Sequence, residues 1–226
     1  MKKMNSSVGR LIVVFMLINL AIPTQGFSSE HKSNYIKDYV TSFFKLRKSK
    51  SSAPKEIVLK TKNTGVFDIN PDTVGACSEI TPRIFITSAH TASDLKKLQA
   101  KKIGLIVNAA SSKCESPFGD KMKYLNLELD DYEDQSILKE IISTSENIRK
   151  FLKKNRRKNV LVHCFAGMSR SCTLVIGHLM ITEGLRLDVA LEKVQNGRNV
   201  CEPNSGFMNQ LRELEQNLVD SNIIKK

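Results

Sequence analysis

Few folds accommodate the segment HCFAGMSRS at residues 163–171 in its sequence context. The apolar run at 160–162 predicts a buried strand before it, and helical spacing begins near Arg170. A strand-to-helix turn containing Gly167 directs backbone N–H groups inward, beside a helix N-terminus. Such a cradle suits a phosphate-sized anion. It also stabilises a thiolate, so we expect Cys164 to be a nucleophile. The planar fork of Arg170 can bind two oxygens of the same anion.

The alternative interpretation of this segment is a buried structural cysteine beside an unrelated Gly-x-Ser-Arg. His163, Cys164, Gly167, Ser169 and Arg170 all occur at fixed spacing between an apolar run and a helical pattern. A coincidence of five residue types in that context is rare at average amino-acid usage. The nucleophile-in-a-cradle interpretation is therefore the stronger one.

The rest of the chain from about residue 74 to 220 alternates strand and helix patterns, which predicts one α/β domain with a mostly parallel central sheet flanked by helices. Residues 221–226 are expected to be a tail. The predicted strands lie at 83–87, 103–107, 123–129 and 159–163. The predicted helices lie at 91–102, 137–153, 170–183, 187–197 and 206–218.

The first 26 residues have the pattern of a secretory signal peptide. Lys2, Lys3 and Arg10 precede a short apolar run at 11–22, and Gly26 supplies a small residue for cleavage. The run is short for a bilayer crossing, which needs about 20 apolar residues. The alternatives are an uncleaved membrane anchor and a buried strand. We expect a protein of the secretory pathway.

Residues 27–73 form a basic arm, which contributes to the net charge of +12. The simplest interpretation is a solvated, flexible segment. Two others remain open. A Ser- and Lys-rich stretch after a signal peptide is typical of a plastid-type second leader. Basic residues at 45–50 followed by Ile57 and Leu59 are also typical of a kinase-docking peptide.

Five cysteines in 226 residues do not make a disulfide scaffold. Cys114 follows a predicted central strand and is a weak candidate for a resolving cysteine near Cys164; an ordinary loop cysteine is the favoured alternative. The sequence contains no CxxC or His/Cys cluster of the spacing that structural metals require, so no metal and no cofactor are expected.

The segment at 163–171 resembles the signature loop of the cysteine-dependent protein phosphatases, in particular the dual-specificity phosphatases. The resemblance covers roughly residues 74–220. It extends to EITPRIFITSAHTASD at 79–94, IGLIVNAA at 103–110, YLNLELDD at 124–131 and EPNSGFMNQLRELEQNL at 202–218. It implies a protein-tyrosine-phosphatase-like fold and a two-step reaction without metal, through a phosphocysteine.

The resemblance also implies roles for individual residues. Cys164 would attack phosphorus, and Arg170 would hold the transferring group. His163 would position and ionise Cys164, and Ser171 would hydrogen-bond the departing thiolate. The loop as a whole would bind substrate, through Phe165, Ala166, Gly167, Met168, Ser169 and Arg170.

The reaction also needs a general acid, because an alcohol or phenol oxygen leaves poorly without a proton. The acidic run at 130–134 follows a predicted strand and precedes a helix. Alignment with the family from Tyr124 onward selects Asp131, and Asp130 is the alternative. An acidic helix N-terminus explains part of the run but not its position.

Substrates are expected to be phosphorylated proteins rather than nucleic acid. Phe165, Ala166 and Met168 occupy loop positions where relatives acting on inositol lipids tend to carry basic residues. No long insertion is available to build a deep slot selective for phosphotyrosine, which favours a shallow site of dual specificity. Two alternatives are an enzyme acting on a lipid, glycan or RNA-end phosphate, and a phosphate-binding pseudophosphatase. The presence of Cys164, Arg170 and Asp131 argues against the pseudophosphatase.

Overall fold

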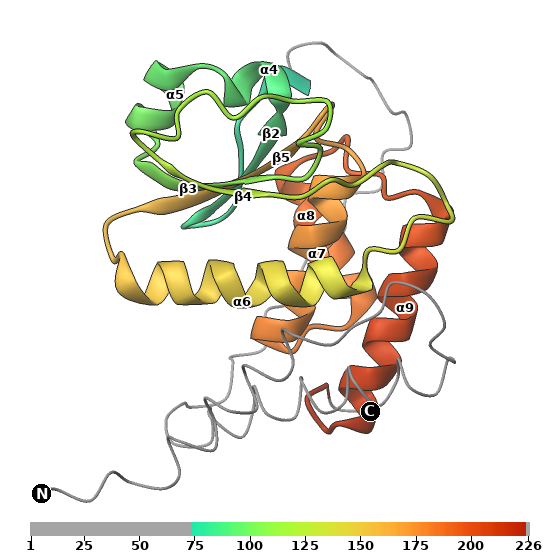
Figure 1. Ribbon diagram of the computed structural model, residues 1–226. Coiled ribbons are helices and arrows are strands. Elements are labelled where there is room, and N and C mark those ends of the chain that lie inside the picture. Colours follow the sequence, from blue (N-terminus) through green and yellow to red (C-terminus); the bar gives the residue numbers. More distant parts are fainter. Residues whose placement is uncertain (1–73, 225–226) are drawn as a thin grey trace, which may run out of the picture.

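The computed structural model describes residues 74–224, which form a five-stranded sheet with helices on both faces (Figure 1). The strand order is β1-β2-β5-β3-β4; β1 is antiparallel to β2, and the other neighbours are parallel. The mostly parallel sheet predicted from the sequence is confirmed. The strands are β1 (Ser78–Thr81), β2 (Ile84–Ser88), β3 (Ile103–Asn108), β4 (Lys123–Asn126) and β5 (Asn159–Cys164).

Alternation along the strands divides the core into two layers, because successive strand side chains point to opposite faces. Phe85, Ile106 and Leu161 belong to a smaller cluster with Leu98. Their neighbours on the same strands join the larger cluster. In Figure 1, α4 and α5 cover one face of the sheet and the remaining helices lie on the other. The helices are α4 (Ala89–Ala92), α5 (Leu95–Ala100), α6 (Leu138–Lys154), α7 (Arg170–Glu183), α8 (Leu187–Gly197) and α9 (Ser205–Asp220).

The single helix predicted at 91–102 is wrong: the structure has two short helices there. The Asp94 side chain accepts a hydrogen bond from the Lys97 N–H and caps α5, while Ser93 bonds back to the Ala89 carbonyl. Both residues favour helix ends over helix interiors. The strand predicted at 123–129 is also shorter, ending at Asn126, and β1 was not predicted.

The residues after α9 do not begin a tail at 221, contrary to the sequence-based expectation. The chain turns at Asn222, whose φ is 57°, and the Ile223 N–H donates to the Leu218 carbonyl. Ile224 is then buried in the larger core cluster. Apolar residues at 223 and 224 therefore extend the domain beyond the predicted limit of 220.

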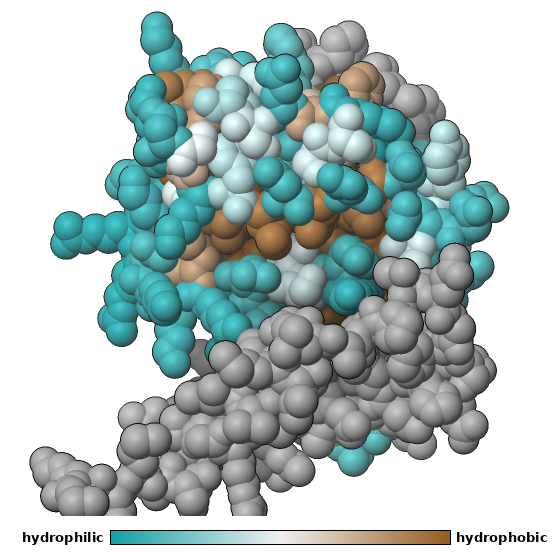
Figure 2. Space-filling view, viewed as in Figure 1, coloured by the Kyte–Doolittle hydropathy of each residue, from teal (hydrophilic) through white to brown (hydrophobic). Residues whose placement is uncertain are grey.

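Figure 2 shows a band of apolar surface across the face viewed in Figure 1, bordered by hydrophilic residues. Within residues 74–224, no helix has both the length and the apolar character that a membrane crossing requires. The predicted leader at 1–26 and basic arm at 27–73 lie outside the described residues, and both stay predictions.

Close packing of α6 on α7 depends on Gly177. A Cβ at this position would lie 2.2 Å from Cγ2 of Ile141, a fully buried side chain of α6. We expect Gly177→Ala to lower the free energy of unfolding by about 1–3 kcal/mol, the usual cost of overpacking. This loss outweighs the gain of about 1 kcal/mol in helix propensity.

The measurement is a urea unfolding midpoint, with Gly119→Ala as the control, because a Cβ at Gly119 meets nothing within 4 Å. Adding Ile141→Ala to Gly177→Ala should cost less than the sum of the two single changes. A Gly177→Ala protein as stable as the wild type would contradict this account of the helix interface.

Candidate active site

The predicted loop lies where the parallel strands end together. β5 ends at Cys164, which pairs in register with Ser88 at the end of β2. On the other side, His163 pairs with Asn108 at the end of β3. Ligand sites of open α/β sheets occur at this carboxyl edge. The loop then runs from Phe165 to Ser169 and enters α7 at Arg170.

Every backbone carbonyl from Phe165 to Ser169 accepts a hydrogen bond from outside the loop or from α7. The donors are the Ala89 N–H to Phe165 (3.0 Å), Arg198 to Ala166 (3.1 Å) and to Gly167 (2.6 Å), the Glu202 N–H to Met168 (3.0 Å) and Thr173 to Ser169 (2.8 Å). No described peptide bond is cis. In a trans peptide the C=O and N–H point in opposite directions, so these contacts turn the following N–H groups the other way, toward one concave side.

The Cys164 thiol lies on that side of the loop. Its Sγ accepts a hydrogen bond from the Gly167 N–H at 3.2 Å and lies 3.4 Å from Ser171 Oγ at the start of α7. The residue is only 1% exposed. The Gly167 N–H thus holds the sulfur beside the loop backbone, with the Ser171 hydroxyl within hydrogen-bond distance of it.

His163 contacts Cys164 through the main chain rather than through sulfur. Its Nδ1 lies 3.2 Å from the Cys164 carbonyl oxygen, which can only accept, so Nδ1 carries the proton. Burial lowers the pKa of His163 below its ordinary value, which keeps the ring neutral. A neutral imidazole in this position holds the end of β5 and thereby the start of the loop.

Arg170 and Asp131 come from distant segments and meet beside the loop. Arg170 Nε lies 3.4 Å from Asp131 Oδ2, and its Nη1 donates to the Leu129 carbonyl at 3.1 Å. Asp131 Oδ1 accepts hydrogen bonds from Ser169 Oγ at 2.6 Å and from Asn204 Nδ2 at 2.9 Å. The carboxylate therefore lies at the rim of the cradle.

Asp130, the alternative acid, faces a different partner. Its carboxylate forms an exposed ion pair with Lys113 Nζ at 2.5 Å. The hydrogen bond from Lys113 holds the pKa of Asp130 below its ordinary value. No contact joins Asp130 to the loop residues 163–171 among its described hydrogen bonds and ion pairs.

Two parts of the site were not predicted from the sequence. Asn204 caps α9 through its bond from the Phe207 N–H and also holds Asp131. Gly206 packs against the acid segment so closely that a Cβ would lie 1.8 Å from the Glu133 carbonyl oxygen. The segment at 202–218 indicated the start of a helix, but a contact with Asp131, which is distant in sequence, could not be predicted from it.

Arg198 is the second part of the site that was not predicted. It follows α8 in a polar stretch, where an exposed residue would be expected, yet it is 1% exposed.

The remaining cysteines are free thiols. Burial raises the pKa of Cys172 well above its ordinary value, and burial followed by the charge of Cys164 raises that of Cys114. Such thiols react slowly. Cys114 is therefore near enough to sense Cys164 electrostatically, but no disulfide joins them. Among residues 74–224, no three His, Cys, Asp or Glu side chains converge as metal ligands would.

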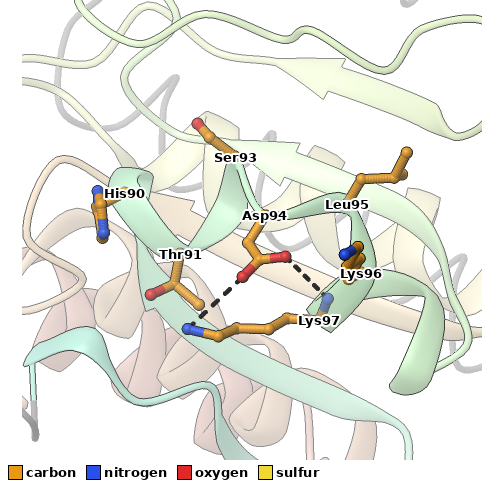
Figure 3. Close-up of a pocket in the computed structure, with 7 residues that line it drawn as sticks. All are labelled: His90, Thr91, Ser93, Asp94, Leu95, Lys96 and Lys97. Atoms are coloured by element: carbon orange, nitrogen blue, oxygen red, sulfur yellow. Dashed lines mark hydrogen bonds and ion pairs between the residues drawn. The ribbon is translucent and has the colours of Figure 1, made fainter.

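A surface hollow of about 440 Å³ lies over α4 and α5 (Figure 3). Its lining residues include Leu95 and the capping residue Asp94, which pairs with Lys97 at 3.7 Å. None of the predicted site residues lines it. Its one carboxylate is occupied in capping α5, so the hollow offers no reactive group comparable to Cys164.

Comparison with known proteins agrees with this geometry. The family model "Dual specificity phosphatase, catalytic domain" matches residues 84–217. The human dual specificity protein phosphatase 13B is 37% identical over 152 residues, covering 65% of this chain and 76% of that protein.

Two solved structures share the fold. A mouse putative dual specificity phosphatase, crystallised with zinc tungstate, superposes with a TM-score of 0.62 at 26% identity, covering 73% of this chain and 99% of the other. The human tyrosine phosphatase-like serine/threonine/tyrosine-interacting protein superposes with a TM-score of 0.57 at 32% identity, covering 62% of this chain and 95% of the other. Since the family model spans more than half of the sequence and includes the Cys164 loop, the chain belongs to the dual-specificity phosphatases.

Proposed function

We propose that this protein phosphatase uses Cys164 as its nucleophile, in a cradle made by the backbone of residues 165–170. The observation that carries the proposal is the outward direction of every loop carbonyl, which leaves N–H groups facing the side occupied by the sulfur. A phosphoryl group placed there meets backbone donors at the atoms where its charge lies. The zinc tungstate complex of the mouse relative supports an oxyanion as ligand.

The reaction follows from these positions in two steps. The Cys164 thiolate attacks phosphorus, an S–P bond forms, and the P–O bond to the substrate breaks as Asp131 gives its proton to the leaving oxygen. Water then attacks phosphorus, Asp131 takes a proton from it, and the S–P bond breaks. Ser171 Oγ, 3.4 Å from the sulfur, donates to the released thiolate.

The ion pair between Arg170 and Asp131 has a part in this sequence. In the ligand-free arrangement Arg170 Nε faces Asp131 Oδ2. An arriving phosphoryl dianion offers the guanidinium a stronger, bidentate partner. Its binding therefore draws the guanidinium toward the phosphoryl oxygens and frees Asp131 Oδ2 for the leaving oxygen.

Exposed aromatic side chains favour a protein substrate. Phe165 follows the nucleophile and Tyr132 follows the acid. Each is 65% exposed, and these two are the exposed large hydrophobic residues among those that the structure describes. The loop itself presents no basic side chain at 165, 166 or 168 for additional phosphates. A rim of this kind fits a peptide better than an inositol headgroup, and we propose phosphotyrosine, phosphoserine and phosphothreonine as substrates.

We expect the purified protein to dephosphorylate phosphotyrosyl and phosphothreonyl peptides faster than soluble phosphoinositides. The measurement is phosphate release at matched substrate concentration. Faster release from phosphoinositides, or from RNA 5′-phosphate, would assign the enzyme to a non-protein substrate. Tungstate binding without any turnover would identify a pseudophosphatase.

Cys164→Ser should abolish turnover of an aryl phosphate while the fold and tungstate binding persist, since the backbone cradle is unchanged. The checks are steady-state rates, circular dichroism and tungstate titration. Cys77→Ser is a useful control, because that thiol packs against the smaller core cluster and makes no described hydrogen bond to the loop. Appreciable turnover by Cys164→Ser would refute the assignment of the nucleophile.

Asp131→Asn should slow hydrolysis about 10²–10⁴-fold, the usual contribution of general acid catalysis. The loss should be greater for alkyl phosphates than for aryl esters with good leaving groups, and the alkaline limb of the pH–rate profile should flatten. Asp130→Asn is the matched control and should leave these rates nearly unchanged. The reverse result, with the effects following Asp130, would identify Asp130 as the acid.

A further inference from the structure

Arg198 is a buried arginine whose five N–H donors all have acceptors. Nε donates to the Gly167 carbonyl at 2.6 Å, and Nη2 donates to the Ala166 carbonyl at 3.1 Å. The other donors reach the segment before and at the start of β1. Nη2 bonds the Val74 carbonyl, and Nη1 bonds the Ala76 carbonyl and Ser78 Oγ, at 3.1 to 3.3 Å. A planar fork of this kind suits several acceptors at fixed angles, and an ammonium does not.

The two loop carbonyls that Arg198 binds belong to consecutive peptide planes. The Ala166 carbonyl shares a plane with the Gly167 N–H, and that N–H donates to Cys164 Sγ at 3.2 Å. The Gly167 carbonyl shares the next plane with the Met168 N–H. Because both peptides are trans, binding their carbonyls on one side presents both N–H groups on the opposite side. Arg198 thus contacts the far side of the peptides that face the sulfur.

Other contacts keep the guanidinium from moving. The segment that it bonds is tied to the sheet and to α4, since Thr87 Oγ1 donates to the Ala76 carbonyl at 2.9 Å and Thr91 Oγ1 to the Gly75 carbonyl at 2.7 Å. Gly167 has φ of 73°, and a Cβ there would lie 2.7 Å from Arg198 Nη2. The guanidinium and the glycine are therefore packed directly against each other.

We propose that Arg198 is a positioning residue for the phosphatase reaction: it orients two loop peptides so that the N–H groups of Gly167 and Met168 face Cys164 and the phosphoryl oxygens. The proposal rests on the function proposed above for Cys164. Arg198 itself touches neither the sulfur nor, by this geometry, the substrate, and it acts through the loop backbone. Without it, the Ala166 carbonyl loses its described donor and the Gly167 carbonyl keeps only the Cys172 thiol at 3.5 Å, a weak donor. Both peptides can then rotate and turn their carbonyls toward an anion.

The test compares Arg198→Met and Arg198→Lys in the full chain. Arg198→Met keeps most of the side-chain volume but removes every donor, and Arg198→Lys keeps the charge but not the fork. Arg83→Met is the matched control. Arg83 also bonds three backbone carbonyls, those of Leu152, Asn155 and Lys158, but it lies at the opposite end of the strands, before Ile84.

We expect Arg198→Met to lower kcat about 10²-fold, the usual cost of losing one preorganised oxyanion donor. The tungstate inhibition constant should rise about 10-fold or more, as expected for lost hydrogen bonds to a charged ligand. The pH midpoint of Cys164 alkylation by iodoacetate should move upward, since the Gly167 N–H no longer holds the sulfur. Arg198→Lys should retain most of these losses. Arg83→Met should lower the urea midpoint and leave all three site measurements as in the wild type.

Wild-type kcat, tungstate inhibition and alkylation midpoint in a folded Arg198→Met protein would overturn the proposal. Full recovery by Arg198→Lys would overturn it as well, because charge alone would then suffice. If Arg198→Met does not fold, Arg198→Lys decides between these outcomes. Cys164→Ser distinguishes failure of the proposed function from failure of this proposal. If Cys164→Ser keeps its turnover, the proposed function fails. If Cys164→Ser loses its turnover while Arg198→Met behaves as the wild type, only the role of Arg198 fails.

Discussion

The outward direction of the loop carbonyls is the constraint on which the rest of the site depends. Five consecutive peptides cannot face an anion with their N–H groups unless something else takes their oxygens, because buried carbonyls need donors. Those donors come from the start of α4, from Arg198 after α8, from Glu202 before α9 and from within α7. The elements on both faces of the sheet thus converge on one loop.

The acid is held by the same convergence. Asp131 belongs to the segment between β4 and α6, far in sequence from Cys164, and reaches the loop through Ser169 and through Asn204 at the cap of α9. Gly206 permits the first turn of α9 to approach the backbone of Glu133. The loop hydroxyl of Ser169 therefore connects the nucleophile's cradle to the acid, and Asn204 fixes the distance between the two segments that carry them.

The sequence predicted the parts of this protein that local pattern determines. Apolar runs identified β2, β3 and β5, and periodic spacing predicted α7 and α8 with the bounds that the structure has. It failed at 91–102, where the capping preference of Ser93 and Asp94 interrupts a helical pattern, and at 221–224, where two isoleucines join the core after a turn.

Nothing local indicated Arg198, because its burial depends on acceptors from Val74, Ala76, Ala166 and Gly167 that only the folded chain brings together. The candidate residues Cys164, Arg170 and Asp131 were available from motif and resemblance, and the structure brings them to one edge of the sheet. The contacts among these residues, such as the ion pair of Arg170 with Asp131, could not be predicted from the sequence and are known only from the structure.

The central claim is that the backbone of residues 166–170 faces an oxyanion beside Cys164. The most direct measurement is a titration of the ¹⁵N-labelled protein with tungstate, followed through its backbone amide resonances. We expect the amides of residues 166–170 to shift most, with saturation at one tungstate for each chain. Saturable binding that leaves those amides unmoved and shifts others instead, such as those of α4 and α5, would contradict the account.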